Sequence, residues 1–501
     1  KKIIKIKMKD YLQVQKDRVS YHFQPFKNTV HRSSLTAPNL PGADTWISFI
    51  NHFLLKRGYK SIALKLSAVD KFGSLLDSKT IQIEKPKVYS LNLNSIFSSV
   101  KPNNFLVDFF SERNLFVPFP AVIISHLGRD FCNTVHSYNR ILNDVFEDDK
   151  INKNHVSEAS FDLKITDKYD TFFNLSSGIS DLQNEKILIS YEKDKFKINK
   201  KIKVSLPRLS YKSFYLSKIF PKNLEGGIVK IRQPKQKLFY GRMLAGRMNK
   251  KTGAFSANHS YYDSSKTKEY FKSSESFRTY PYFEKFTNQI TMYPVFSPSK
   301  LDIKIKIYCN GKEYLSPNFK FSSSSSVPLN IIVNDFVDSK KLKGVTAFTI
   351  IANTKNGKIP TRLNHQLVYG DTNRSNSLKC SINVSLTNKE VFVPKKRTSF
   401  VWGQIINHKN YRSKLGFCFK TSEGKDEKVK ITFYNDKGQA KSFTKSLNPK
   451  KSIILDTNKI FGNSKKFQFY WYTAKSLKPN LSAYAFHVNK ISGNSSGEHN
   501  F

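Results

Sequence analysis

Residues 122–138 read VIISHLGRDFCNTVHSY, and this stretch decides how we interpret the rest of the chain. Its ending, a short run that leads to a histidine, recurs in variant form along the sequence. The five histidines concerned are His31, His136, His259, His365 and His487, spaced by 105, 123, 106 and 122 residues. A long spacing follows a short one twice. The spacing predicts a tandem array of domains about 110 residues long.

A second repeated ending supports this array. An apolar run closes on a phenylalanine at Phe97, Phe220, Phe336 and Phe461, with spacings of 123, 116 and 125 residues. Two tryptophans, Trp46 and Trp402, are each followed five residues later by an Asn-His pair. Both patterns indicate that one module was copied along the chain.

The residue pattern within each module is that of β-strands. Residues 303–309 alternate apolar and other side chains, and the turn Asn310-Gly311 follows them. An Asn-Gly pair between alternating runs is a strong hairpin signal. Almost no stretch has a helical period. We therefore predict an all-β fold of tandem antiparallel β-sandwich domains, immunoglobulin-like in size.

The repeats set the expected domain boundaries. We expect about four complete units and an N-terminal partial unit, which is the tail of a truncated upstream repeat. The boundaries are 1–37, 38–150, 151–270, 271–380 and 381–501. The chain starts at Lys1 on a strand-like run, so we expect it to be a piece of a longer protein.

The charge balance of the chain indicates what kind of partner it could bind. The chain has 84 basic and 38 acidic residues, a formal net charge of +46. One interpretation is a polyanionic partner, and the other is a lysine-rich composition without function. Basic residues are spread along the whole chain, whereas a nucleic-acid site more often shows a local arginine-rich patch. An acidic polysaccharide or cell-surface glycan is therefore the expected partner, ahead of nucleic acid.

Cysteine usage and hydropathy add little. The four cysteines lie far apart in the sequence, which indicates no thiolate metal site. No apolar run approaches the roughly 20 residues that span a bilayer. We predict no transmembrane segment, and we favour the cell envelope or the extracellular space over the cytoplasm.

The repeated tails supply the first candidate binding residues. They are His31, His136, Tyr138, His259, Tyr261, His365 and His487. These side chains either bind a ligand in each domain or pack the tail against its sheet. Duplication favours packing, because copies of one ancestor keep the residues that hold their cores together. No carboxylate stands at a fixed offset from all five histidines.

Two smaller sets complete the candidates. Asn51, His52, Asn407 and His408 form the first, and an asparagine of this kind can cap a turn. Imidazoles suit Zn or Cu, but a site needs three or four converging ligands, and the sequence does not indicate convergence. We predict no metal and no cofactor. Arg242 and Arg247, in GRMLAGR, either hold an anion in a backbone turn or are solvated.

No stretch indicates a reaction. Neither Gly-x-Ser-x-Gly nor a phosphate-binding glycine loop is present. Trp46, Trp402 and Trp471 either form a platform for sugar rings or fill the cores. We expect a non-enzymatic, multi-domain binding or structural protein that contacts glycans or other anionic surface polymers. The alternatives are a carbohydrate-active enzyme, or an accessory part of one, and a basic nucleic-acid-associated protein.

Overall fold

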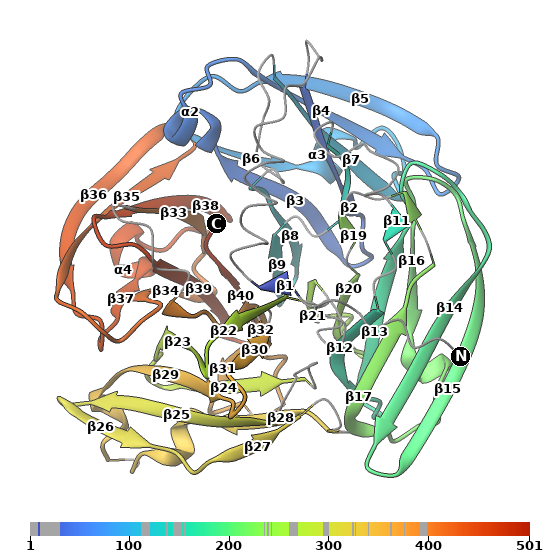
Figure 1. Ribbon diagram of the computed structural model, residues 1–501. Helices are drawn as coiled ribbons and strands as arrows, with labels where there is room; N and C mark the ends of the chain where they lie inside the picture. Colours follow the sequence, from blue (N-terminus) through green and yellow to red (C-terminus); the bar gives the residue numbers. More distant parts are fainter. Residues whose placement is uncertain are drawn as a thin grey trace.

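The computed structural model is nearly all β, as the sequence predicts. The structure describes the chain except residues 1–8, 11–30, 112–120, 137–138, 144–152, 155–156, 235, 238–239, 242, 260–268, 294–299, 323–324, 326, 339, 361–362, 375 and 390–397. Most of the described strands form four antiparallel sandwiches, each made of two sheets. We call inner the sheet whose last strand lies near the centre of Figure 1, and outer the other sheet.

The first sandwich contains two sheets and the longest helix of the described residues. Its outer sheet has the order β19 (Tyr240–Gly241), β10 (Asn139–Asn143), β2 (His31–Pro38), β7 (Asn104–Ser111), β4 (Ile62–Val69), β5 (Leu75–Gln82). Its inner sheet has the order β6 (Val88–Asn92), β3 (Ala43–Ile50), β8 (Ile123–Gly128), β9 (Cys132–His136). Helix α2 (His52–Arg57) follows β3. Strand β2 begins ahead of the expected boundary at residue 38 and pairs with β7 along its full length.

The second sandwich has the same plan. Its outer sheet has the order β12 (Ser157–Lys164), β17 (Glu225–Arg232), β14 (Leu182–Lys193), β15 (Phe196–Leu206). Its inner sheet has the order β16 (Tyr211–Tyr215), β13 (Tyr169–Ser176), β20 (Leu244–Asn249), β21 (Phe255–His259). A separate pair joins β11 (Lys153–Asn154) to β18 (Gln236–Lys237).

The third sandwich keeps the inner order and adds one outer strand. Its outer sheet has the order β23 (Glu275–Pro281), β29 (Val345–Asn353), β25 (Leu301–Cys309), β26 (Lys312–Leu315), with β27 (Phe319–Phe321) also on β25. Its inner sheet has the order β28 (Leu329–Ile332), β24 (Phe286–Met292), β31 (Asn364–Asp371), β32 (Cys380–Ser385). Strand β32 crosses the boundary expected at residue 380. Nearby, β22 (Glu269–Lys272) pairs with β1 (Lys9–Asp10) and β30 (Lys358–Pro360).

The fourth sandwich repeats the plan without additions. Its outer sheet has the order β33 (Ser399–Asn407), β38 (Gln468–Ser476), β35 (Glu427–Asn435), β36 (Gly438–Leu447). Its inner sheet has the order β37 (Ile453–Asp456), β34 (Tyr411–Phe419), β39 (Leu481–Asn489), β40 (Ser495–His499). Trp402 therefore lies in the first strand of an outer sheet, whereas Trp46 lies in a strand of an inner sheet. The two segments in which a tryptophan precedes an Asn-His pair are therefore not equivalent copies.

A short helical turn occupies one equivalent place in every sandwich. The four turns are α3 (Leu93–Ile96), η2 (Leu216–Lys218), η4 (Val333–Phe336) and α4 (Thr457–Phe461). Each follows the edge strand of an inner sheet, and each contains the phenylalanine of the second repeated ending or ends one or two residues before it. One further turn, η5 (Leu342–Gly344), precedes β29. The phenylalanine spacing therefore identifies the repeat correctly.

The four sandwiches form a closed ring, as Figure 1 shows, with the last strand of each sandwich near the centre. Neighbouring last strands contact one another in all four pairs: β9 with β21, β21 with β32, β32 with β40, and β40 with β9. The bonds between them include Asn133 Oδ1, which accepts from Ala257 N at 2.7 Å, and Ser496 Oγ, which accepts from Thr134 N at 3.0 Å. The chain therefore closes on itself instead of extending as a string.

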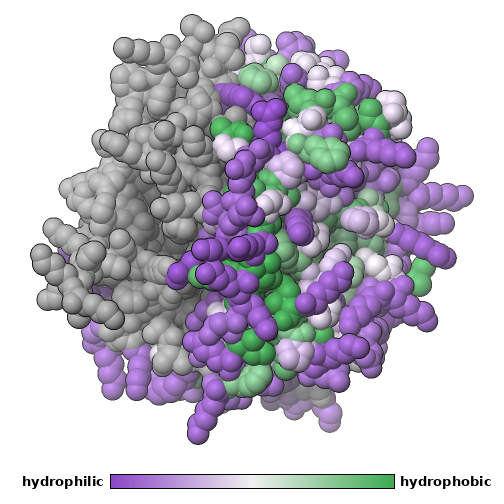
Figure 2. Space-filling model, turned by 90° about the vertical axis from the view of Figure 1, so that its right-hand side faces the viewer, coloured by the Kyte–Doolittle hydropathy of each residue, from purple (hydrophilic) through white to green (hydrophobic). Residues whose placement is uncertain are grey.

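Apolar packing continues across the junctions between sandwiches. The core of the first sandwich includes Phe255 of the second and Trp402 and Trp471 of the fourth. The core of the third includes Tyr484 and Phe486 of the fourth. Domains that share an apolar core are restrained relative to one another. Hydrophilic side chains dominate the described surface on the side of the ring that Figure 2 presents, and apolar groups lie in small patches between them.

Candidate functional site

The strand register brings one position of each sandwich to the centre of the ring. Within the inner sheets, His136 pairs with Ile123, His259 with Leu244, Val384 with His365, and His499 with Tyr484. These four positions are equivalent, because each lies at the same place on the last strand. Three of them are histidines and the fourth is Val384.

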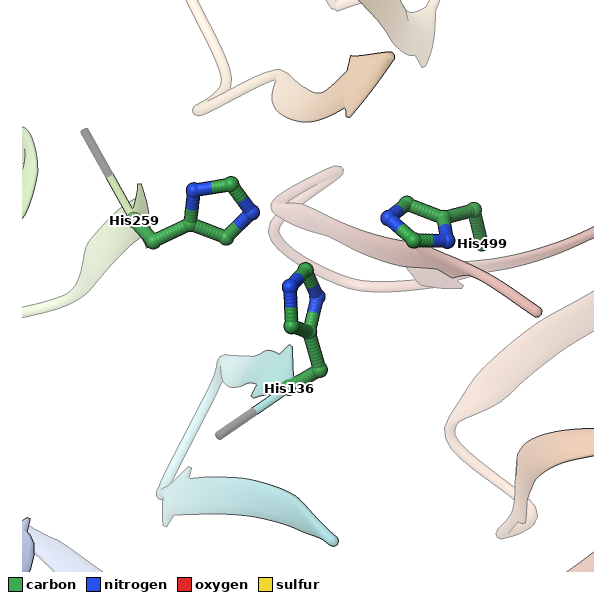
Figure 3. Close-up of side chains that lie close together, drawn as sticks. All are labelled: His136, His259 and His499. Atoms are coloured by element: carbon green, nitrogen blue, oxygen red, sulfur yellow. The ribbon is translucent and has the colours of Figure 1, made fainter. Parts of the chain in front are cut away.

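The three equivalent histidines converge. One ring nitrogen of each of His136, His259 and His499 lies within 4.8 Å of the others. The ring centroid of His136 is 4.4 Å from that of His259 and 4.9 Å from that of His499. Figure 3 shows the rings of His259 and His499 on either side of His136, all three turned toward a common point. The sequence did not indicate such convergence, because the three strands belong to different sandwiches.

A buried glutamate, Glu498, lies beside the three histidines. We call His136, His259, His499 and Glu498 the axial cluster, because they lie at the centre of the ring. Glu498 Oε2 lies 3.1 Å from His136 Nδ1, although the two atoms are not aligned as a hydrogen bond. The carboxylate also accepts from the backbone N–H groups of His136 and His499, each at 2.9 Å. Burial acts to raise the pKa of Glu498, but attraction to His136 and His499 outweighs it and brings the pKa to about 2. The carboxylate is therefore ionised at neutral pH.

The other two rings have fixed orientations. His499 Nδ1 lies 2.6 Å from the carbonyl oxygen of Asn500, and the Asn383 amide nitrogen lies 3.2 Å from His259 Nδ1. Burial lowers the pKa of His499 to about 4, with Glu498 opposing the shift. Imidazoles held in place around one point are suitable ligands for a transition-metal ion. The axial cluster is the arrangement in the described residues that fits such an ion.

A polar pocket adjoins the axial cluster between the second and third sandwiches. It encloses about 250 Å³ and is lined by Lys164, Arg247, Asn258 and His259 from the second sandwich and by Gln289, Tyr293, Gln366 and Lys379 from the third, among others. Ser256 Oγ donates to Lys379 O at 3.0 Å, so the strands that frame the pocket are bonded together. The pocket is therefore part of the ring architecture.

Three cationic side chains share this pocket. Burial, with repulsion from Arg247 and Lys164, lowers the pKa of Lys379. Lys164 pairs with Glu225 at 2.8 Å, whereas none of the described carboxylates lies within ion-pair distance of Lys379. A bound anion would relieve the repulsion among these three cations. The chemistry of the pocket therefore favours an anionic ligand.

The structure places the candidate histidines of the repeated endings in different surroundings. His136 and His259 belong to the axial cluster, as described. His365 lies in β31 and faces Tyr280, whose hydroxyl is 2.6 Å from His365 Nε2. His487 lies in β39, with Nδ1 2.9 Å from Ser413 Oγ. The expectation of one shared position is therefore wrong for His365 and His487, which lie inside their own sandwiches on β31 and β39, the strands that pair with the last strands.

The Asn-His pairs take part in capping and packing. The Asn51 side chain accepts from Leu54 N at 3.2 Å and caps α2. His52 is buried and stacks on Trp402 across the junction of the first and fourth sandwiches, with centroids 5.4 Å apart. Asn407 Nδ2 donates to Gln468 Oε1 at 3.3 Å, and His408 stacks on Phe467 at 4.4 Å. These contacts explain the four residues by packing and capping.

The remaining candidates divide in two groups. Arg247 lines the pocket, and His31 begins β2, where its backbone pairs with Ser111. Tyr138, Tyr261 and Arg242 lie outside the described residues.

The tryptophans do not form an exposed platform. Trp471 is fully buried and donates from Nε1 to Ser48 Oγ at 2.8 Å, and Trp402 is 6% exposed. Trp46 is half-buried against Phe469. The four described cysteines are also buried, and none forms a disulfide.

Sequence reasoning missed His499, Glu498, Lys164 and Lys379. A signal for His499 was present: a histidine followed by Ser or Asn and then by Tyr or Phe occurs at 136–138, 259–261 and 499–501. His487 fits the spacing of the other histidines, so the spacing predicts His487 in place of His499. No comparable signal marks the two lysines, because the packing of two sandwiches brings them together.

Comparisons with known proteins add limited information. No protein-family model matches the chain, and no curated protein matches it. Among solved structures, a tetra-tandem repeat from the extending region of a large adhesion protein aligns at 9% identity over 93% of this chain and 98% of that one, with a TM-score of 0.10. The chicken CNTN1 FN1-FN3 domains align at 9% identity over 71% and 98% of the two chains, with a TM-score of 0.10. The M60 catalytic domain with two CBM51 domains of Clostridium perfringens ZmpB aligns at 10% identity over 91% and 55%, with a TM-score of 0.12.

These TM-scores are too low to support any argument about arrangement or activity. The conclusion that the chain is a multi-domain, nearly all-β protein therefore rests on its own sheets. Among the described residues, no helix has the length and apolar character needed to cross a bilayer.

Proposed function

We propose that this chain is a non-enzymatic, multi-domain binding protein whose pocket between the second and third sandwiches holds an acidic saccharide. The observation that carries the proposal is the meeting of Lys164, Arg247 and Lys379 in one pocket that is otherwise mostly polar. Cationic side chains there would pair with a carboxylate or sulfate, and the amides and hydroxyls around them would bind sugar hydroxyl groups.

The form of the pocket supports a small acidic ligand over a long nucleic acid. About 250 Å³ is close to the lower end of ligand-binding cavities. A nucleic-acid site more often tracks the backbone along a groove with interleaved aromatic residues. The lining includes two aromatic residues, Tyr169 and Tyr293, and several amide side chains, among them Gln289, Asn330 and Gln366. This set suits a compact polar ligand with one or two negative groups.

The lining also supports binding over hydrolysis. Glycoside hydrolysis generally uses a pair of carboxylic residues on either side of the scissile bond. None of the residues that line this pocket is an aspartate or a glutamate. An acidic-glycan ligand further supports a location in the cell envelope or outside the cell.

The test is calorimetric titration with uronic-acid and sulfated oligosaccharides at two ionic strengths, with neutral oligosaccharides and single-stranded DNA as comparison ligands. We expect Lys379→Met and Arg247→Met to weaken binding of the acidic sugars at least tenfold. The matched control is Lys200→Met on the exposed edge of the same sandwich, which should bind normally. Failure of every acidic sugar to bind, or equal binding by all variants, would contradict the proposal, and preferential DNA binding would favour the nucleic-acid alternative.

A further inference from the structure

His136, His259 and His499 occupy equivalent positions at the axis of the ring, and this arrangement points to ligand binding there. Packing alone does not require an imidazole at this position, because the third sandwich places Val384 there. The three histidines come from the first, second and fourth sandwiches, and their nitrogens approach one another to within 4.8 Å.

The burial of a carboxylate beside the cluster also suits a metal ion. Glu498 is 5% exposed, so its carboxylate is removed from most of the solvent. Its contacts are two backbone N–H groups and the imidazoles of His136 and His499. No lysine or arginine among the described residues forms an ion pair with it. A buried carboxylate is stabilised by a paired cation or a nearby metal ion.

We propose that His136, His259 and His499 bind one divalent transition-metal ion, of which Zn²⁺ is the first to test. Each histidine supplies one ring nitrogen, and Glu498 acts as a positioning residue that orients the His136 ring from its Nδ1 side. This metal site is independent of the acidic-saccharide pocket, although His259 borders both.

The geometry requires only a small adjustment. Ligand nitrogens at about 2.0–2.1 Å from a tetrahedral Zn²⁺ stand about 3.3 Å apart. The nitrogens here lie within 4.8 Å of one another, so the rings must draw together by side-chain rotation. Figure 3 shows that they already point toward a common centre.

The outer contacts match those of metal-binding histidines. Such a histidine usually has its second nitrogen at a carboxylate or a backbone carbonyl. His136 has Glu498 in that place, and His499 has the carbonyl of Asn500. Val384 contributes no ligand, so one coordination position is left for water or an exogenous ligand. The bound ion would connect three of the four sandwiches at the axis of the ring.

The experiment is titration of the metal-stripped full chain with Zn²⁺ by calorimetry, followed by Co²⁺ substitution and visible absorption spectroscopy. We expect one ion per chain and the absorption bands of four-coordinate Co²⁺. His136→Ala, His259→Ala and His499→Ala should each abolish tight binding, and Glu498→Gln should weaken it roughly 10–100-fold. His408→Ala, in the fourth sandwich but away from the axis, is the control and should bind as the wild type does.

A second measurement keeps the proposal testable if the alanine variants do not fold. Electron paramagnetic resonance of the Cu²⁺-loaded wild-type chain reports the number of imidazole nitrogens bound to the ion. Three nitrogens would support the site. Fewer nitrogens, no binding of Zn²⁺, Co²⁺ or Cu²⁺ to the wild type, or binding that survives all three histidine substitutions in folded protein, would overturn it. Loss of metal binding with saccharide binding intact would leave the pocket proposal standing.

Discussion

At the scale of single residues, the molecule uses histidine in two ways that the sequence does not distinguish. His365 is fully buried inside the third sandwich, between the Tyr280 hydroxyl and the carbonyl of Leu363. His136 lies at the centre of the ring beside a carboxylate. Both follow similar short runs, and their difference arises from the strand on which each lies. A spacing rule locates histidines along the chain but not the face or strand they occupy.

The buried histidine in β31 predicts a pH dependence of stability. Burial, with repulsion from Arg278, lowers the pKa of His365 from 6.5 to about 3 in the folded state. The unfolded chain therefore binds the proton more readily, and the free energy of unfolding should decrease as pH falls from about 6.5 toward 3. One pKa unit corresponds to about 1.4 kcal/mol, so the contribution is at most a few kcal/mol.

Urea unfolding at several pH values checks this expectation for His365. His365→Gln keeps a polar group near Tyr280 but cannot take up a proton in this range. Its stability should therefore depend less on pH below 6.5 than that of the wild type. An identical slope in the two proteins would show that other groups determine the acid sensitivity.

At the scale of elements, the phenylalanine spacing identified equivalent positions in all four sandwiches. The histidine spacing identified equivalent positions for only some of its histidines. Phe97, Phe220, Phe336 and Phe461 all lie at the end of, or within two residues after, the short turn that follows the edge strand of an inner sheet. A large apolar residue at that turn must fill the end of each core, so its place is fixed by packing. Asn310-Gly311 likewise forms the predicted hairpin, with positive φ at both residues. Local chemistry therefore predicted the strands, the turns and the fold class.

The short turn α3 gives a prediction of its own. The Asn92 side chain accepts from Ser95 N at 3.1 Å and caps the turn. Asn92→Ala should lower the free energy of unfolding by about 1 kcal/mol, because one N–H at the start of the turn loses its partner. Thermal unfolding of Asn92→Ala and Asn92→Ser measures the effect. Serine can still cap the turn, so a loss as large in Asn92→Ser would point to the Asp44 contact instead of the cap.

At the scale of the whole molecule, the axial cluster and the pocket depend on closure of the ring. Lys164, Arg247 and Lys379 lie far apart in the sequence and meet only where the second and third sandwiches pack together. His136 and Glu498 meet only where the first and fourth sandwiches do. These are long-range consequences of domain packing, and no single repeat contains them. This is why the sequence predicted the modules and not the site.

The junction of the first and fourth sandwiches is open to a direct test. Ser48 is fully buried and bonds Gln404 at 2.5 Å and Trp471 at 2.8 Å. Ser48→Arg would place a charged side chain in this junction, and we expect the ring to open there. Small-angle X-ray scattering should show an increased radius of gyration, with β-sheet circular dichroism retained.

The control for this change is Ser78→Arg, on the exposed strand β5 of the same sandwich. It adds the same charge to the surface and should leave the scattering unchanged. An unaltered radius of gyration in folded Ser48→Arg would show that the remaining contacts are sufficient to hold the two sandwiches together.

The bond between Thr134 and Ser496 joins residues that are 362 positions apart in the chain. At ribosomal rates of about 5–20 residues per second, the second partner emerges roughly 20–70 s after the first. During this interval the apolar face of the first sandwich that later receives Trp402 and Trp471 has no cover. Nascent chains should therefore be vulnerable to misassociation until the fourth sandwich has been synthesised, and their yield should depend on chaperones that shield this face.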